Sequence, residues 1–219
     1  MAVEKGIHYL AFGDSLTVGY GASEGHGFVP ILQNRLKSKL NVPVTLKHAG
    51  TNGATTGQLL EAIMSDAELQ MEIQKATLMT ITAGGNDLIQ AAIPFFYEGD
   101  NAVLKAALHT YETNYRRMIN AINKIRAGIT KPLLIAVIGL YNPIPQVPDA
   151  AYWVQRFNLF LRKLEQPHLC VVQVYDAFVG QAMRYISDDA IHPNEDGYEQ
   201  VANRLEAALL EQLQQLYFA

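Results

Sequence analysis

The sequence is poor in several features that define special classes of protein. It has one cysteine, Cys170, in an apolar stretch, so no internal disulfide can form and we expect a small core residue. Charged residues make up 17% of the chain and the net charge is −4, so there is no basic footprint and we expect no nucleic-acid partner. The longest apolar run, 132–140, has the length of a strand and is far too short for a transmembrane segment.

The N-terminus also lacks a recognisable targeting segment. The first residues lead directly into a predicted strand, without a separate apolar region and cleavage site. We therefore expect a protein that is cytoplasmic, or exported without a visible signal peptide. The length of 219 residues and a hydrophobic fraction of 49% predict one globular domain over residues 1–219 with a sizeable core.

Predicted strands alternate with predicted helices along the whole chain. The strands are expected at 7–12, 42–48, 77–82, 133–139 and 168–175, and the helices at 28–40, around 59–63, and at 104–127, 152–164, 178–185 and 195–216. Such alternation predicts a parallel sheet with right-handed crossovers, in an α/β fold with three layers, α/β/α. We predict a flavodoxin-like doubly wound sheet of five parallel strands in the order 2-1-3-4-5. The proline in 42–48 favours a sheet edge for that strand, and the wholly apolar 133–139 favours a central position.

A candidate nucleophile follows the first strand. The apolar run ends at Gly13, which permits a sharp turn, and Asp14 and Ser15 come next. Ser15 is therefore expected at the carboxyl end of a strand, where functional groups gather in open α/β sheets. A serine needs a base within hydrogen-bond reach, and a third group that orients the base.

A candidate base and acid lie near the other end of the chain, before the last helix. His192 and Asp189 are three residues apart, so the carboxylate can bond one ring nitrogen while the other faces Ser15. Asp188 is the alternative acid. Taken alone, the same pattern is also typical of a helix cap with a surface histidine.

Two further loops offer hydrogen-bond donors. Gly53 follows the second strand, and Asn86 follows the third in the sequence Gly-Gly-Asn-Asp. With the backbone N–H of Ser15, the N–H of Gly53 and the amide of Asn86 can form a three-donor oxyanion site. Each of these loops taken alone is equally typical of an ordinary turn.

These four blocks resemble those of the GDSL, or SGNH, hydrolases. The blocks are Gly-Asp-Ser-Leu at 13–16, Gly53, Gly-Gly-Asn-Asp at 84–87, and Asp-Ala-Ile-His-Pro at 189–193, in the family order. The resemblance covers nearly the whole chain, and the first block looks most like the bacterial lysophospholipase and arylesterase-like branch. It implies ester hydrolysis through an acyl-enzyme, with Ser15, His192 and Asp189 as the triad and Gly53 and Asn86 as oxyanion donors.

The substrate is expected to be a small-molecule or lipid ester. Apolar inserts after the third and fourth strands can form an acyl pocket of limited size, which predicts short to medium acyl chains; the candidate wall residues are Ile93, Phe95, Phe96, Tyr141 and Asn142. These aromatics can instead fill the core under a long loop. Phospholipase or lysophospholipase activity, carbohydrate deacetylation by the same triad, and a non-catalytic flavodoxin-like binding domain are the alternatives.

No metal or organic cofactor is expected. The remaining histidines do not have the spacing of metal ligands, and the predicted oxyanion donors already supply the electrophilic assistance that a metal would give.

Overall fold

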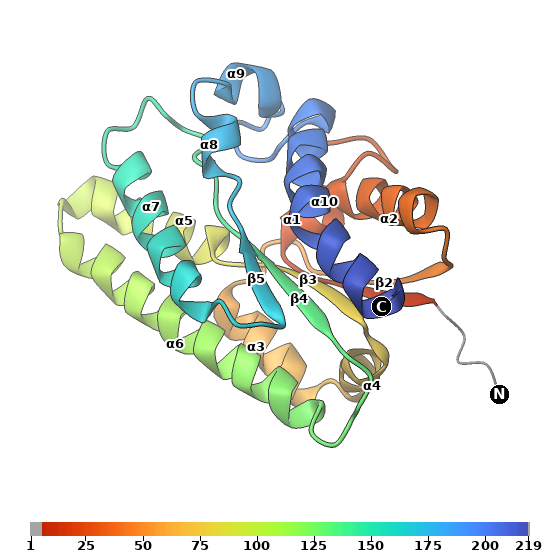
Figure 1. The fold of residues 1–219 in the computed structure, drawn as a ribbon. Coiled ribbons are helices and arrows are strands. Elements are labelled where there is room, and N and C mark those ends of the chain that lie inside the picture. The colour runs from red at the N-terminus through yellow and green to blue at the C-terminus, as the bar shows by residue number, and fades with distance from the viewer. Residues whose placement is uncertain (1–5, 219) are drawn as a thin grey trace.

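Five parallel strands form one sheet in the order β2-β1-β3-β4-β5, as predicted (Figure 1). The computed structural model describes residues 6–218, and side chains as far as residue 216. The strands are β1 Ile7–Gly13, β2 Val44–Gly50, β3 Leu78–Thr82, β4 Leu134–Ile138 and β5 Leu169–Val172. β2 lies at an edge, whereas all five residues of β4 are buried between β3 and β5, as their sequences predicted.

The register brings the carboxyl ends of the central strands to one edge of the sheet. Gly13, the last residue of β1, pairs with Gly50 of β2 and with Thr82 of β3. Thr82 in turn pairs with Ile138 at the end of β4. The loops that follow these strands therefore open on the same side, which is where ligands bind in open α/β sheets.

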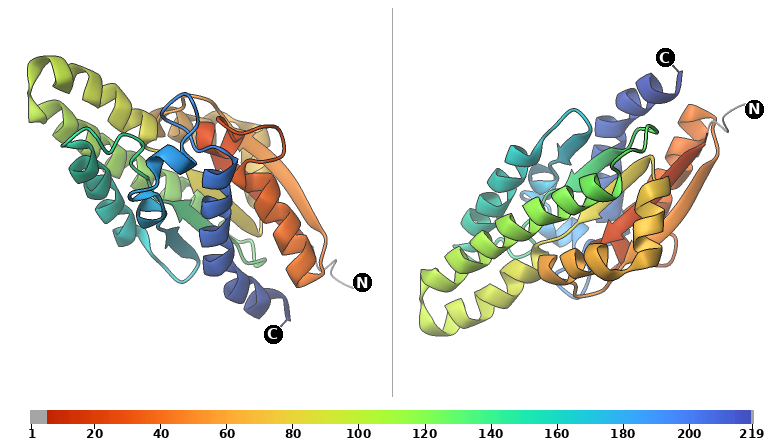
Figure 2. Two further views of the ribbon diagram at one scale, coloured as in Figure 1. Left: turned by 90° about the horizontal axis from the view of Figure 1, so that it is seen from above. Right: turned by 90° about the horizontal axis from the view of Figure 1, so that it is seen from below.

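Helices cover both faces of the sheet, so the fold has three layers (Figure 2). α2 Phe28–Leu40 and α10 Glu195–Phe218 pack on one face, and α3 Thr56–Ser65, α4 Ala67–Lys75, α6 Asn101–Ile125 and α7 Ala150–Leu161 on the other. Each face has its own apolar core, one built around Tyr111 and Phe157 and the other around Phe28 and Tyr198. Within the described residues, no helix is long and apolar enough to cross a membrane.

The short elements near the sheet edge differ from the prediction. The strand expected at 168–175 ends at Val172, and the helix expected at 178–185 is two single turns, α8 Tyr175–Phe178 and α9 Ala182–Tyr185. Gly180, at φ 71°, lies between them in the left-handed conformation, which interrupts the helix. Two further short elements are the one-turn α1 Ser15–Val18, which follows β1, and the 3₁₀ turn η1 Arg162–Leu164, which precedes β5.

A helix that the sequence did not predict, α5 Gly85–Glu98, follows β3 and pairs with α6. It contains Pro94, and an internal proline removes a backbone hydrogen bond and argues against a helix in sequence analysis. α5 begins after Gly84 and ends at Gly99, both in the left-handed conformation, and none of its residues is fully buried. α5 therefore lies at the surface, beside the carboxyl edge of the sheet.

Candidate active site

Ser15 is presented by a tight turn between β1 and α1. A Cβ atom on Gly13 would lie 2.3 Å from the carbonyl oxygen of Thr82, so only glycine fits where β1 meets β3 so closely. Asp14 caps the one-turn helix by accepting a hydrogen bond from the N–H of Leu16 at 3.0 Å. Ser15 is then the first helical residue, and its own N–H has no acceptor within the helix.

Asp14 is buried and serves the turn. Its carboxylate accepts a hydrogen bond from the hydroxyl of Thr82 at 2.8 Å, and its backbone N–H donates to the same residue. Burial raises the pKa of Asp14, while the hydrogen bonds from Thr82 and Leu16 act against that shift. Asp14 thus locks the turn to β3.

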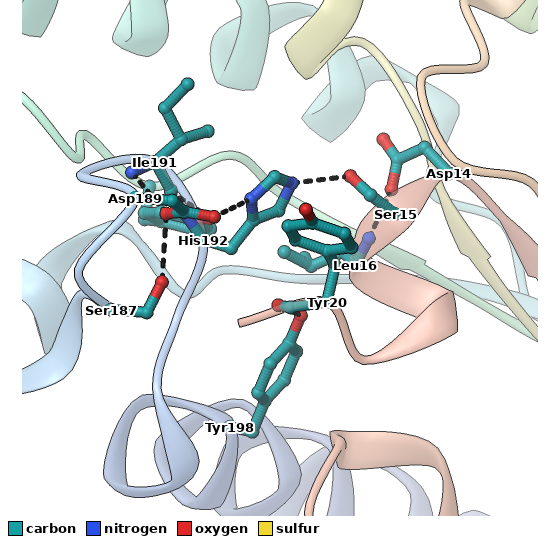
Figure 3. A network of polar contacts seen from close by, with 10 residues as sticks. Asp14, Ser15, Leu16, Tyr20, Ser187, Asp189, Ile191, His192 and Tyr198 are labelled. Atoms are coloured by element: carbon teal, nitrogen blue, oxygen red, sulfur yellow. Dashed lines mark hydrogen bonds and ion pairs between the residues drawn. The ribbon is translucent and has the colours of Figure 1, made fainter. Parts of the chain in front are cut away.

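The loop between α9 and α10 places His192 and Asp189 beside Ser15 (Figure 3). The Oγ atom of Ser15 lies 2.8 Å from Nε2 of His192, and Nδ1 of His192 lies 2.6 Å from Oδ2 of Asp189. The three residues that the sequence put forward as a triad thus form one continuous chain of contacts. Asp189, rather than the alternative Asp188, is the carboxylate hydrogen-bonded to the imidazole.

Asp189 is held by several donors besides His192. Its Oδ1 accepts the backbone N–H groups of Ile191 and His192, each at 2.8 Å, and the hydroxyl of Ser187 at 2.9 Å. Partial burial raises the pKa of Asp189, but these hydrogen bonds outweigh it and hold the pKa well below its usual value. Ala190 takes a positive φ of 61° so that the following N–H groups can face this carboxylate. Asp189 therefore remains ionised at and below neutral pH.

One aromatic ring packs against the histidine, and two further tyrosines bond to neighbouring backbone carbonyls. The ring of Tyr20 lies 4.8 Å from that of His192 between centroids, and the hydroxyl of Tyr198 donates to the carbonyl of Tyr20 at 2.7 Å (Figure 3). On another side, the hydroxyl of Tyr141 donates to the carbonyl of Ile191 at 2.8 Å. No role near the histidine was predicted for Tyr20 or Tyr198, although Tyr20 closely follows the Gly-Asp-Ser-Leu block.

The loops that carry Gly53 and Asn86 are tied together. Asn86, on the first turn of α5, donates one amide N–H to the carbonyl of Ala54 at 2.9 Å, which leaves its second N–H for another acceptor. Gly53 has a φ of 74°, and the space that a Cβ would occupy there is open. The neighbouring Asp87 accepts hydrogen bonds from the backbone and side chain of Thr56, so it joins α5 to the start of α3.

An apolar cavity of about 270 Å³ opens beside Ser15 and His192. α5 contributes Leu88, Ile89, Ala92, Phe95 and Phe96; the other apolar side chains include Leu104, Leu140, Ile144, Val147, Trp153 and Val154. Tyr141 and Asn142, from the segment after β4, also line the cavity. The polar lining is sparse and includes Asn86, Asn142 and Asp149. The cavity can therefore hold an apolar chain with a polar group next to Ser15.

Ile93 does not line this cavity, contrary to the sequence prediction. Because the segment is a helix rather than a loop, the residues that face the cavity recur at helical spacing, as Leu88, Ala92 and Phe95 do. Ile93 lies beside this face and is 56% exposed. The alternative that these aromatics fill the core does not hold for Phe96, which is 59% exposed, whereas Phe95 is partly buried and packs against the core as well as lining the cavity.

Comparisons with known proteins agree with this arrangement. Residues 11–200 match the family described as GDSL-like lipase/acylhydrolase. The chain is 34% identical over 204 residues to a protein named spore germination lipase LipC of Bacillus licheniformis, a match that covers 92% of this chain and 96% of that protein.

Solved structures share the fold. The lipase Lip_vut3 from a goat rumen metagenome has a TM-score of 0.90 and 33% identity, and the match covers 94% of this chain and 99% of that one. The psychrotrophic esterase EstA from Pseudoalteromonas sp., solved inhibited by monoethylphosphonate, has a TM-score of 0.65 and covers 94% of this chain and 98% of its own. At 19% identity, the likeness to EstA concerns the fold alone.

Proposed function

Because the chain belongs to the GDSL-like lipase/acylhydrolase family, we propose that it hydrolyses carboxylic esters of short to medium acyl chains with a Ser15–His192–Asp189 triad. The single observation that carries the proposal is the continuous set of contacts from Ser15 Oγ through the imidazole to Asp189, at 2.8 and 2.6 Å. Both distances lie within hydrogen-bond reach, as general-base activation of a serine requires.

In the acylation step, Ser15 Oγ attacks the ester carbonyl carbon and gives its proton to Nε2 of His192. Asp189, ionised and bonded to Nδ1, fixes the tautomer with the proton on Nδ1 and stabilises the imidazolium. Nε2 then gives its proton to the leaving alcohol oxygen as the C–O bond breaks, and the acyl group remains on Ser15. Water repeats the sequence, which releases the carboxylic acid and returns the proton to Ser15.

The negative charge on the former carbonyl oxygen needs donors close to Ser15. We propose the backbone N–H groups of Ser15 and Gly53 and the second amide N–H of Asn86 for this role. The N–H of Ser15 has no helical acceptor, Gly53 leaves open space around its Cα, and Asn86 uses only one N–H on Ala54. Removal of one such donor typically costs ~10²–10³ in kcat. The reaction uses no metal or organic cofactor.

The apolar cavity supports an acyl group as the part of the substrate that is bound. Its volume of about 270 Å³ falls just below the range of roughly 300–1,000 Å³ usual for ligand pockets, which favours short to medium chains. The sparse polar lining gives little support to a carbohydrate, which would need many hydrogen-bond partners. Carbohydrate deacetylation is therefore the weaker alternative.

A series of p-nitrophenyl esters from acetate to palmitate tests this proposal. We expect kcat/KM to rise from acetate as methylenes enter the cavity, each worth ~0.8 kcal/mol, and to fall again well before palmitate. If palmitate gave the highest kcat/KM, a long-chain lipase or a lysophospholipase would replace the proposed substrate class. If no ester were turned over by the folded protein, a non-catalytic binding role would replace the proposed function.

A further inference from the structure

A second hollow lies on the surface between α6 and α7, behind the apolar cavity. It measures about 240 Å³, and most of the residues around it carry a charged or polar group: Lys105, His109, Glu112, Tyr152 and Arg156, together with Leu108. Trp153, the sole tryptophan of the chain, lines this groove and also lines the apolar cavity. Trp153 is therefore the residue that the two hollows share.

The neighbouring turn of α6 shows the same division. Leu104 lines the apolar cavity, whereas Leu108, one helical turn later, lines the groove. Trp153 is 6% exposed and belongs to the same apolar core as both leucines. The indole thus fills the junction between α6 and α7 at the point where the two hollows approach each other.

On the basis of the function proposed above, we propose that Trp153 is the residue that sets the upper limit of acyl-chain length. Ser15 and His192 line the cavity from the carboxyl edge of the sheet, and the indole closes it on the α6–α7 side. A longer acyl chain that extends away from Ser15 reaches the indole of Trp153. Additional methylenes then have no apolar volume to enter, so they add no binding energy and must bend back or remain in water.

Replacement of the wall is expected to extend the preference to longer esters. Trp153→Ala joins the cavity to the groove, and each methylene that becomes buried improves kcat/KM about fourfold. We expect the ratio of kcat/KM for p-nitrophenyl decanoate over butyrate to rise about tenfold or more. Trp153→Leu, a smaller change that preserves more of the core, should give an intermediate shift.

Arg156→Ala is the matched control. Arg156 lies one turn further along α7, lines only the groove and is exposed. Its loss should leave the chain-length profile unchanged. An equal shift in Trp153→Ala and Arg156→Ala would assign the effect to a loosened α7 and overturn the proposal, as would an unchanged profile in folded Trp153→Ala and Trp153→Leu.

The wild-type protein supplies a readout that depends neither on turnover nor on the folding of a variant. Because Trp153 is the sole tryptophan and lines the cavity, its fluorescence reports chains that reach the wall. Titration with butanoate, octanoate and dodecanoate should leave the emission unchanged for an acid too short to reach the indole, and change it for an acid long enough to touch it. Emission that responds to none of these acids would overturn the assignment. If the protein shows this emission series but hydrolyses no ester, the proposal for Trp153 stands and the proposed function is wrong.

Discussion

The ring of Tyr20 lies against the imidazole of His192, with the two centroids 4.8 Å apart. His192 is held at its two ring nitrogens by Ser15 and Asp189, and its side chain is only 18% exposed. The backbone of Tyr20 is itself fixed by the hydroxyl of Tyr198. Tyr20 therefore covers a histidine in an exposed loop and limits its rotation away from Ser15.

This contact predicts that the ring of Tyr20 matters more than its hydroxyl. Tyr20→Leu should lower kcat about five- to tenfold, because the imidazole then spends less time in the competent orientation and the apparent rate falls with that fraction. Tyr20→Phe keeps the ring and should restore most of the rate. Steady-state kinetics on one activated ester will separate the variants, and equal losses in both would indicate a role for the hydroxyl instead.

The two adjacent carboxylates should differ sharply in activity assays. Asp189→Asn removes the charge that orients His192 and is expected to reduce kcat/KM by ~10⁴, the scale known for the equivalent change in a serine protease triad. Asp188→Asn is the matched control and should stay within a few-fold of wild type, since it is Asp189 that contacts the imidazole. Comparable losses in the two variants would contradict the observed geometry of the loop.

The lowered pKa of Asp189 also predicts a pH-dependent contribution to stability. A carboxylate whose pKa is lower in the folded state stabilises that state above its unfolded pKa of about 3.9, and the contribution disappears as pH falls through the folded value. The difference in Tm between wild type and Asp189→Asn should therefore shrink progressively as the pH falls below about 4. Thermal melts over this range measure it, and a difference that did not change with pH would contradict the assignment.

Ala190 offers a test of the backbone in the same loop. Its φ of 61° lies in the left-handed region, which costs a non-glycine residue roughly 1–2 kcal/mol, whereas glycine adopts it freely but loses more chain entropy on folding. Ala190→Gly should thus be neutral or stabilising by about 0.5 kcal/mol. Ala190→Val, with a branched side chain at the same φ, should destabilise. Urea unfolding of the pair decides the matter, and a clear destabilisation by glycine would argue against this loop conformation.

Much of this architecture was predictable because it depends on local patterns. Apolar runs that alternate with segments of helical spacing were enough to predict the five parallel strands. The turn residues around Gly13, Asn86 and His192 were enough to predict that their polar groups lie at one edge of the sheet. The strand order was a choice among topologies, and the observed register confirms it.

The parts that escaped prediction depend on tertiary contacts. The position of Tyr20 over His192 and the position of Trp153 between two hollows come from segments that meet only in the folded chain. α5 was not predicted, and it contains Pro94, a residue that argues against a helix. The prediction for Ile93 was wrong for the same reason. In a loop this side chain could face the cavity, whereas in the helix it is exposed.

Covalent labelling of Ser15 is the most direct test of the central claim, that this serine is the nucleophile of an ester hydrolase. A fluorophosphonate should modify the wild-type protein at Ser15 alone, as peptide mass spectrometry can locate, and abolish ester turnover in proportion to labelling. Ser15→Ala should take up no label and show no turnover above background, with an unchanged circular dichroism spectrum and Tm. Labelling at a different serine, or turnover that persists in folded Ser15→Ala, would contradict the account.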